Sequence, residues 1–457
     1  MSFLVEETLR AAIVAALYLA IFAAVEVWRW LAAPPPEWTR KAVHLAGGIV
    51  ALFLPWLVHS HWTVLALGAS FAAVLLLTRR LGWLQSVHGV ERRSEGGVYF
   101  PIAIYLVFLL AADQPVFYLI SILALVLSDA LAALVGTAYG RTIYRVEDDR
   151  RSVEGSAVFF LVTFLGVHLP LLLLTDIDPA ASVLIGVQIG LLVTLLEAVS
   201  LRGGDNLIVP LATYFLLSRM TPLPADRVGL HIIAQLVIVG LLALLMWRSR
   251  MLTGSGIVAA SLFFYGAWSL GGPAWLAAPV LGLLVFRWIA GRFGPEVPAG
   301  DARYQVLAVW HTTAVAILAF VLDDALQIVS GAPMPVSGAV FYPLYLGALA
   351  AHLAMLGTIF LHGSQWAAEA SFRHRMIGLA LGIGVIVPIG IWVGPAGWTA
   401  RSLLVPTAMA LVAVLAYPLL WRWRRLPREK PWDLRMQSAS TAAAAILVLP
   451  LVLDWLV

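Results

Sequence analysis

The sequence contains no cysteine and few charged residues. Without a thiol, the chain can form neither a disulfide bond nor a thiolate metal site. Charged residues make up 12% of the 457 residues and apolar residues 61%, whereas a soluble globular domain carries about twice that charged share. We also expect no cleavable signal peptide, because the N-terminus begins with Glu6 and Glu7 and no small-residue cleavage site follows its apolar run. Together these absences argue against a disulfide-stapled or soluble protein.

Long hydrophobic runs take the place of the missing charges. Runs of about 17–25 residues, each long enough to cross about 30 Å of hydrocarbon, recur from one end of the chain to the other. We therefore predict an all-α, polytopic integral membrane protein with about sixteen transmembrane helices, of which two or three short ones could be re-entrant. The predicted spans are 11–31, 42–58, 62–78, 98–112, 116–138, 156–174, 181–199, 207–218, 229–247, 256–270, 274–290, 305–322, 339–361, 376–392, 402–421 and 438–456.

The basic residues predict the orientation of these spans. Lysine and arginine concentrate in cytoplasmic loops. If the N-terminus is outside, 25 of the 29 basic residues fall on the cytoplasmic side, and only Arg10, Arg219, Arg227 and Arg401 fall outside. We therefore predict a protein of the inner (cytoplasmic) membrane whose two termini both lie on the non-cytoplasmic side. A basic run at 422–435 then lies against the anionic inner leaflet.

The distribution of polar motifs predicts two membrane domains, 1–250 and 251–457. Before residue 250, polar motifs cluster at the ends of spans, and the predicted topology places them all on the cytoplasmic side. Any chemistry is therefore expected at the cytoplasmic face of the first domain. Four polar patches stand out there: "TRKAVHLAGG" (39–48), "SDALAALVGTAYG" (128–140), "RRSVEGS" (150–156) and "EAVSLRGGDNLIVP" (197–210).

The second patch places an acid near the inner end of an apolar helix. Gly136 and Gly140 follow Asp129 at helical spacings that bring each glycine within about 20° of Asp129 on one face. A carboxylate above a stripe of small residues allows close approach of another backbone or of a ligand. One interpretation is a helix-packing face with one tolerated acid. The other is a functional acid, which is the usual role of acids at membrane depth.

The third patch is an arginine-rich loop followed by a helix start. Its polar and small residues are Arg150, Arg151, Ser152, Glu154, Gly155 and Ser156. Ser152 and Glu154 are typical capping residues, which is a purely structural explanation. Alternatively, the arginines and the free N–H groups of the helix start form a polyphosphate site.

The fourth patch adds oxygen ligands. Glu197 ends one helix, and Asp205 and Asn206 follow a turn at Gly203 and Gly204. Asp205 either caps the next helix or joins the aspartate of the second patch as a metal ligand. Two or three such oxygens suit Mg²⁺, which binds through one or two carboxylates plus substrate phosphates.

The first patch brings Arg40, Lys41 and His44 to a helix entrance. The two basic residues either anchor the helix on the positive side of the membrane or bind phosphate. His44 lies one turn from Arg40 and is either a phosphate contact or a hydrogen-bonded packing residue. Carboxylates, basic residues and glycine turns on one membrane face are the groups that metal-assisted phosphoryl transfer to a lipid head group requires.

About residues 35–220 resemble the CTP-dependent lipid-alcohol kinases, which include phytol kinase, dolichol kinase and the CTP-using diacylglycerol kinase and are related to phosphatidate cytidylyltransferase. The order and spacing of the matching pieces fit this family. One departure is Arg151, where the family commonly has lysine, and this change keeps the charge. The pieces are "RKAVHLAGG", "GGVYFPIAIYLV", "SDALAALVGTAYG", "RSVEGSAVFF" and "EAVSLRGGDNLIVP".

The resemblance implies CTP as the phosphoryl donor, Mg²⁺ as the cofactor and a lipid hydroxyl as the acceptor. Mg²⁺ would be held by Asp129 and Asp205, with Glu197 close by, and Glu154 would orient the acceptor hydroxyl or a metal-bound water. The residues expected to contact the substrates are Arg40, Lys41, His44, Gly136, Gly140, Arg151, Ser152, Gly155, Ser156 and Asn206. Membrane lipids complete the expected partners, and no nucleic acid is expected.

The second domain resembles, more weakly, the prenyl-phosphate kinase family. That family phosphorylates the lipid monophosphate that a lipid-alcohol kinase produces. The matching pieces are "LTGSGIVAASLFF" (252–264), "DARYQVLAVW" (301–310) and "GSQWAAEAS" (363–371). The family's aspartate in the last piece is Ser364 here, and its asparagine after "QVLA" is Val309, although Glu369 is retained. We therefore expect this domain to be non-catalytic, as a lipid-holding or scaffolding unit.

The leading hypothesis is a kinase that transfers the γ-phosphoryl group of CTP to a long-chain alcohol of the prenol, phytol or polyprenol class. A cytidylyltransferase is the nearest alternative, but its long C-terminal signature is missing. A transporter predicts acids near the middle of the membrane, whereas the acids here cluster at one face, with Glu26 as the main exception. A membrane scaffold without activity is the third alternative. The residues do not identify the alcohol.

Overall fold

Helices make up nearly all of the computed structural model, which describes residues 3–88, 95–247, 251–293, 304–330, 340–362, 370–395, 397–424 and 430–453. The chain divides into two compact units, Met1–Ile233 and Ala234–Val457. The boundary between them falls within a helix, and residue 250, the predicted boundary, lies outside the described residues.

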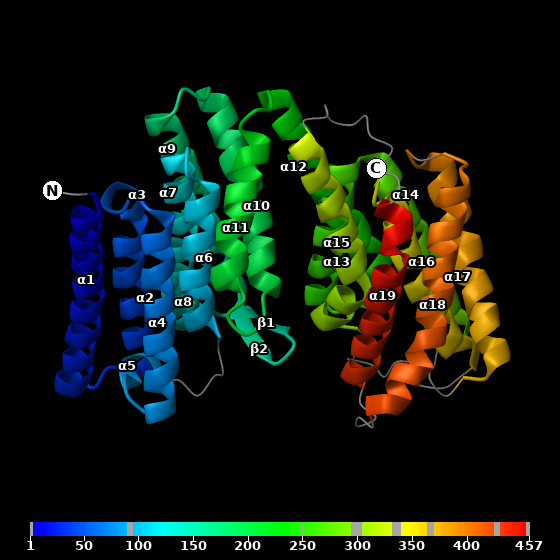
Figure 1. Cartoon of the computed structure of the whole chain (residues 1–457), viewed down its shortest axis with the longest axis horizontal. Helices are drawn as coiled ribbons and strands as arrows, with labels where there is room; N and C mark the ends of the chain where they lie inside the picture. Colours follow the sequence, from blue (N-terminus) through cyan, green and yellow to red (C-terminus); the bar gives the residue numbers. More distant parts are fainter. Residues whose placement is uncertain are drawn as a thin grey trace. The chain divides into compact units, whose positions relative to one another are not determined.

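The first unit contains the helices drawn from blue to green in Figure 1. Its elements are α1 (Phe3–Ala32), α2 (Pro36–Leu52), α3 (Leu54–Leu57), α4 (His61–Leu81), α5 (Gln85–His88), α6 (Gly96–Leu110), α7 (Pro115–Leu123), the π-helical turn η1 (Ala124–Ser128), α8 (Asp129–Tyr139), β1 (Ile143–Val146), β2 (Asp149–Ser152), α9 (Val153–Leu174), α10 (Pro179–Val199), α11 (Asp205–Met220) and α12 (Ala225–Trp247), which crosses the boundary.

The second unit begins within α12, at Ala234. Its helices are α13 (Gly254–Gly271), α14 (Pro273–Phe293), α15 (Val306–Ser330), α16 (Tyr342–His362), α17 (Phe372–Val393), α18 (Ala400–Arg424) and α19 (Lys430–Leu453).

The prediction of a polytopic, helical membrane protein is confirmed. Within the described ranges, twelve helices are long and apolar enough to cross a membrane, and α7, η1 and α8 form one of them, Pro115–Tyr139. The other predicted spans coincide with α2, α6, α11 and α13, which contain 17, 15, 16 and 18 residues. At 1.5 Å per residue, α6 extends about 22 Å, which is short of a full hydrocarbon core. The count of sixteen and the orientation of the termini stay predictions.

One feature departs from the all-α expectation. Strands β1 and β2 form an antiparallel hairpin in which Tyr144 pairs with Arg151 and Arg145 with Arg150. Its tight turn has Glu147 at a φ of 53°, in the left-handed region that such turns require. The sequence predicts only a loop here, because strands of four residues leave no periodic hydrophobic signal.

Helix starts in the first unit follow local chemistry. Proline occupies the first helical position of α2, α7 and α10 as Pro36, Pro115 and Pro179, where its missing N–H has no cost. Asp178 caps α10 by accepting a hydrogen bond from the Ala181 N–H at 3.0 Å.

Side-chain hydrogen bonds and close packing join these helices. Within the first unit, α9 packs against both α8 and α10, and α6 packs against α4 and α11. The buried Tyr118 hydroxyl of α7 donates to the Ala51 carbonyl of α2 at 2.8 Å. The Thr163 hydroxyl of α9 donates to the Ser128 hydroxyl at 2.9 Å, which connects α9 to the π-helical turn just before Asp129.

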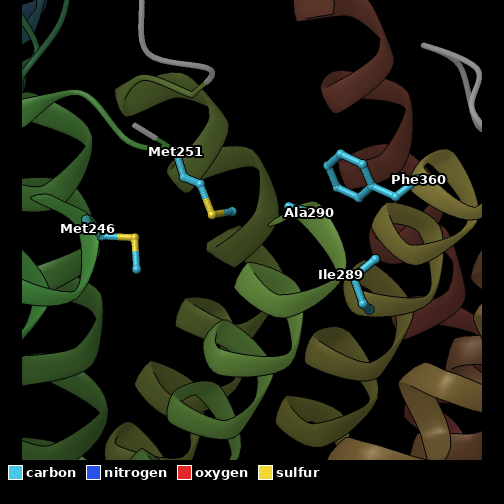
Figure 2. Packing of buried hydrophobic residues seen from close by; sticks show 5 residues of the cluster. All are labelled: Met246, Met251, Ile289, Ala290 and Phe360. Atoms are coloured by element: carbon cyan, nitrogen blue, oxygen red, sulfur yellow. The ribbon is translucent and has the colours of Figure 1, made fainter. Parts of the chain in front are cut away.

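The second unit is built around α16, which packs against α15, α17, α18 and α19. A Cβ atom at Gly378 or Gly382 of α17 would collide with the Ala354 or Ala350 carbonyl of α16, so only glycine permits this approach. Figure 2 shows a smaller apolar cluster at Met246, Met251, Ile289, Ala290 and Phe360, where the end of α12 packs near α14 and α16. The second unit therefore has its own core.

Candidate active site

A cavity of about 640 Å³ opens in the first unit, at the end where α5 and the β1–β2 hairpin lie (Figure 1). All four polar patches, which the sequence placed on one membrane face, contribute to its lining. Of the predicted site residues, those that line it are Arg40, Lys41, His44, Asp129, Gly136, Arg151, Ser152, Gly155, Ser156, Glu197, Asp205 and Asn206. Gly140 and Glu154 do not.

Asp129 lies at the junction of η1 and α8, and its carboxylate faces α2. The Lys41 ammonium donates to Asp129 Oδ2 at 2.6 Å, and His44 Nε2 lies 3.5 Å from the same oxygen. Lys41 retains only 6% of its accessible surface. A buried ammonium requires such a partner, because desolvating an unpaired charge is costly. The pair therefore connects α2 and α8 in the lining of the cavity.

His44 is held between charge and an aromatic ring. Its imidazole lies 5.1 Å from the Phe100 ring of α6, and its buried Nε2 has no hydrogen-bond partner among the described residues. Both interpretations of His44 thus keep support, because it packs against Phe100 and its Nε2, at 3.5 Å from Asp129 Oδ2, makes no hydrogen bond among the described residues.

Arg40 forms a separate pair one turn away, where Arg40 Nε donates to Glu37 Oε2 at 3.1 Å. Burial opposes ionisation of Glu37, but the hydrogen bonds and charge of Arg40 outweigh it and lower the pKa of this carboxyl. Glu37 precedes the predicted span 42–58, so this pair lies at the start of α2, outside the span, and both side chains stay ionised.

Arg151 is placed by the hairpin. The Tyr144 and Ser156 hydroxyls lie 2.7 Å apart, which docks β1 onto the first turn of α9. Arg151 then reaches the end of α10, where it forms an ion pair with Glu197 and donates to the Ser200 carbonyl at 2.9 Å. Within the part of the chain that the structure describes, its buried Nε has no hydrogen-bond partner. A donor left over in this way is available to an anionic ligand.

Asp205 differs from the other four acids of the cavity, each of which pairs with a lysine or arginine. It is the first residue of α11 rather than its N-cap, which is Gly204, and Asp205 Oδ1 accepts the neighbouring Asn206 N–H at 3.1 Å. The preceding turn places Gly203 at a φ of 83°, where glycine is favoured. Among the described residues no lysine or arginine forms an ion pair with Asp205, although Arg151 and Lys41 act on it through space. Its carboxylate is therefore the one most open to a cation.

The glycines of the second and third patches serve helix packing. A Cβ at Gly136 would lie 2.9 Å from Ser152 Oγ and 3.4 Å from Gly155 Cα, so α8 and α9 meet backbone to backbone. Ser152 caps α9 by accepting the Gly155 N–H at 3.1 Å. The capping and packing interpretations thus hold for these residues. Their predicted contact with a nucleotide stays a prediction.

Glu154 is turned away from the cavity. Its carboxylate accepts the Thr142 N–H at the start of the hairpin, at 3.0 and 3.3 Å. The predicted role of Glu154 in orienting the acceptor hydroxyl therefore has no support in the geometry. A sequence shows that a residue begins a helix, but the neighbouring hairpin decides which way its side chain points.

Sequence reasoning missed three charged residues of the cavity, and one of them is Glu37, the partner of Arg40. Arg79, in the last turn of α4, forms an ion pair with Glu95 at 3.7 Å, and both line the cavity. Glu95 directly precedes the first glycine of "GGVYFPIAIYLV", so its place beside a matching piece was the available signal.

The acids of the cavity fit Mg²⁺ only with help from a substrate. Within the described part of the chain, no group of three or more His, Asp or Glu residues is arranged to hold a metal ion. Lys41 and Arg151 already neutralise Asp129 and Glu197. Asp129, Asp205 and the Asn206 amide nevertheless face one cavity. This donor set fits a cation that is bound by one or two carboxylates and completes its shell with substrate oxygens and water.

The charges of the lining support the same conclusion. Five arginines and lysines and five carboxylates line the cavity, so its formal charge is balanced when His44 is neutral. A polyphosphate entering such a site meets as many acids as bases. A divalent cation that accompanies the phosphates would remove that repulsion.

The chain is similar in sequence to a known enzyme. No protein-family model and no solved structure matches the chain. Phytol kinase of Synechocystis sp. (strain ATCC 27184 / PCC 6803 / Kazusa) is 34% identical to it over 202 residues. The match covers 44% of this chain and 86% of that relative.

Proposed function

Because the chain belongs to the phytol kinase family, we propose that it is a membrane kinase that phosphorylates a long-chain lipid alcohol of the prenol, phytol or polyprenol class, with CTP as the donor. The observation that carries the proposal is the cavity that unites Lys41, Asp129, Arg151 and Asp205 at one end of the membrane helices. Phosphoryl transfer depends mainly on positioning and charge stabilisation, and this lining provides both.

In the proposed reaction the oxygen of the alcohol attacks the γ-phosphorus of CTP. The bond between that phosphorus and the β–γ bridging oxygen breaks, and the hydroxyl proton passes to water. The products are a lipid monophosphate and CDP. The phosphate oxygens are bound by Arg40, Lys41 and Arg151. Of these side chains, Arg151 already has a free donor, because its Nε has no hydrogen-bond partner among the described residues.

Asp129 and Asp205 are the residues that would hold Mg²⁺, with Glu197 behind Arg151. When bound, the ion would neutralise phosphate charge and so stabilise the transition state. In the structure Asp129 holds Lys41. We infer that Lys41 moves from this carboxylate to the phosphates when the nucleotide binds, since one ammonium can serve either partner.

The transporter alternative loses its main argument in the structure. Glu26, the exception among the acids in the sequence, forms an ion pair with Arg29 at 2.6 Å and accepts the Ser86 N–H of α5 at 3.1 Å, at the same end of the unit as the cavity. It therefore fixes the short helix α5 against α1. The cytidylyltransferase alternative keeps the same ligands and is separated by the product, because it would release pyrophosphate and a CDP-lipid.

We further propose that the second unit is non-catalytic. Two of its matching pieces meet, since the Thr253 N–H donates to the Tyr304 carbonyl at 3.0 Å and Thr253 caps α13. Val309, where the related family has asparagine, is buried in α15. Ser364 and Glu369 lie outside the described residues.

The test is a direct assay of the purified full-length chain in detergent or liposomes. Labelled CTP or ATP is offered with Mg²⁺ and either a panel of lipid alcohols or phosphatidate, the acceptor that a cytidylyltransferase requires, and lipid products are separated. The proposal expects a labelled lipid monophosphate from γ-labelled CTP, and none from the Asp129→Asn/Asp205→Asn variant. Label transfer only from α-labelled CTP would identify a nucleotidyltransferase, and no lipid product with any alcohol would refute the kinase.

A further inference from the structure

The cavity has a second, apolar part that polar motifs do not explain. Its lining includes Tyr18, Ile21, Phe22, Phe71, Leu75 and Leu76, which come from α1 and α4. We call this set the apolar lobe. A free nucleotide would gain nothing from such a wall. The lobe is continuous with the polar end at Lys41, Asp129 and Arg151, so a ligand that fills both parts is an amphiphile with a polar head and an apolar chain.

We propose that the apolar lobe binds the hydrocarbon chain of the alcohol next to its hydroxyl, and that Tyr18, Phe22 and Phe71 form the end wall that decides which chains fit. This inference rests on the proposed kinase function. It assigns the part of the enzyme that selects among lipid alcohols.

The end wall is closely packed. The Tyr18 and Phe71 rings meet edge to face with centroids 5.2 Å apart, and the Phe22 and Phe71 rings stack at 5.4 Å. The Tyr18 hydroxyl donates to the Gly47 carbonyl of α2 at 2.9 Å. A Cβ at Gly47 would lie 3.1 Å from Tyr18 Cε1, so this glycine lets Tyr18 lie flat against α2. The three rings are thus held in place by α2 and by one another.

The lobe runs along the membrane helices rather than across their ends. On α4 the lining extends from Arg79 at the charged mouth to Phe71, a separation of eight residues or about 12 Å at 1.5 Å per residue. A chain lying there follows the direction that lipid chains take in a bilayer. Its hydroxyl would then be at the polar end.

The lobe also lies close to the lipid. Leu76 lines it and is 46% exposed, and its neighbours Val74 and Leu77 on α4 are exposed too. Helix α4 is therefore a thin wall between the lobe and the surrounding membrane, through which an alcohol dissolved in the bilayer has a short path to the site.

The test measures kcat/KM of the purified full-length chain for isoprenoid alcohols of increasing length, with the nucleotide saturating. Phe71→Ala enlarges the lobe and is expected to raise the ratio of kcat/KM for long over short alcohols by about tenfold or more, since a single methylene group in a hydrophobic pocket already changes specificity by about tenfold or more. Ile21→Phe narrows the lobe and is expected to lower the same ratio. Phe53→Ala is the matched control, because Phe53 is exposed and lies outside the cavity.

The outcomes separate this inference from the function on which it rests. The KM for CTP is expected to stay unchanged in all three variants, which shows that the polar end is intact. If the wild type phosphorylates alcohols but neither Phe71→Ala nor Ile21→Phe changes the chain-length ratio, the lobe does not hold the chain and is occupied by something else, such as a structural lipid. If the wild type phosphorylates no alcohol, the proposed function itself fails.

Discussion

Replacing Asp129 with asparagine tests the polar end of the cavity most directly. Asp129 Oδ2 accepts a hydrogen bond from the Lys41 ammonium at 2.6 Å and lies 3.5 Å from His44 Nε2. The Lys41 side chain keeps 7% of its accessible surface. The amide removes the negative charge without a large change in shape. Lys41 is then a nearly buried ammonium without a charged partner.

The expected cost in stability follows from that burial. Removing one partner of a buried ion pair lowers the free energy of unfolding by about 3–5 kcal/mol. The Asp129 side chain is 22% exposed, so water reaches the pair and the lower end, about 3 kcal/mol, is expected. Turnover is expected to fall by about 10²-fold or more, because a main stabiliser of transition-state charge is lost.

The assay compares Asp129→Asn, Lys41→Met and the double variant, all purified in one detergent. Each is measured for its thermal unfolding midpoint and for lipid monophosphate formation. The single variants are expected to unfold at lower temperature than the wild type. The double variant is expected to recover most of that stability, since no unpaired charge remains, yet to stay inactive because the metal ligand and the phosphate-binding ammonium are both absent.

Two results would refute this reasoning. Near-full turnover of Asp129→Asn would remove Asp129 from the catalytic machinery. A double variant that is less stable than either single variant would show that the pair contributes packing rather than charge compensation.

The remaining predictions concern other parts of the chain. Asp205→Asn is expected to lose turnover by about 10²-fold with an unchanged unfolding midpoint, because none of the described cations is paired with it; a large drop in the midpoint would contradict this. Gly136→Val is expected to cost about 1–3 kcal/mol in thermal unfolding assays, because α8 and α9 touch there, and an unchanged midpoint would argue against that contact. Ser364→Ala is expected to leave monophosphate formation unchanged, and a lipid diphosphate from the intact enzyme that depends on Ser364 would show that the second unit is a working kinase. Reporters inserted at Arg145 and Lys430 should both read cytoplasmic, and an outside reading at either would break the predicted topology.

The sequence by itself determined the class of protein and the approximate positions of its apolar helices. Hydrophobic runs are local, and each predicted span overlaps at least one described helix, although twelve helices are long and apolar enough to be candidate spans within the described residues. Helical periodicity also placed Asp129 and Gly136 on one face, and both line the cavity. These features follow from neighbours along the chain, because backbone hydrogen bonds inside a membrane must be satisfied within the same helix.

The tertiary structure decided which charges meet. Lys41 and Asp129 are 88 residues apart, and no local pattern distinguishes that pair from the other combinations of bases and acids in the four patches. The π-helical turn positions Asp129, and the hairpin positions Arg151, so these two elements decide which charged residues come into contact. Glu154 shows the same dependence in reverse, since the hairpin's Thr142 N–H draws its carboxylate away from the cavity.

The apolar lobe was likewise hidden in the sequence. Tyr18, Phe22 and Phe71 look like any other aromatic residues of membrane spans, and nothing in their spacing distinguishes a cavity wall from a lipid-facing surface. Only the approach of α1 to α4, with Gly47 of α2 making room for Tyr18, brings the three rings together. Packing between distant helices depends on shape complementarity, which a pattern along the chain does not encode.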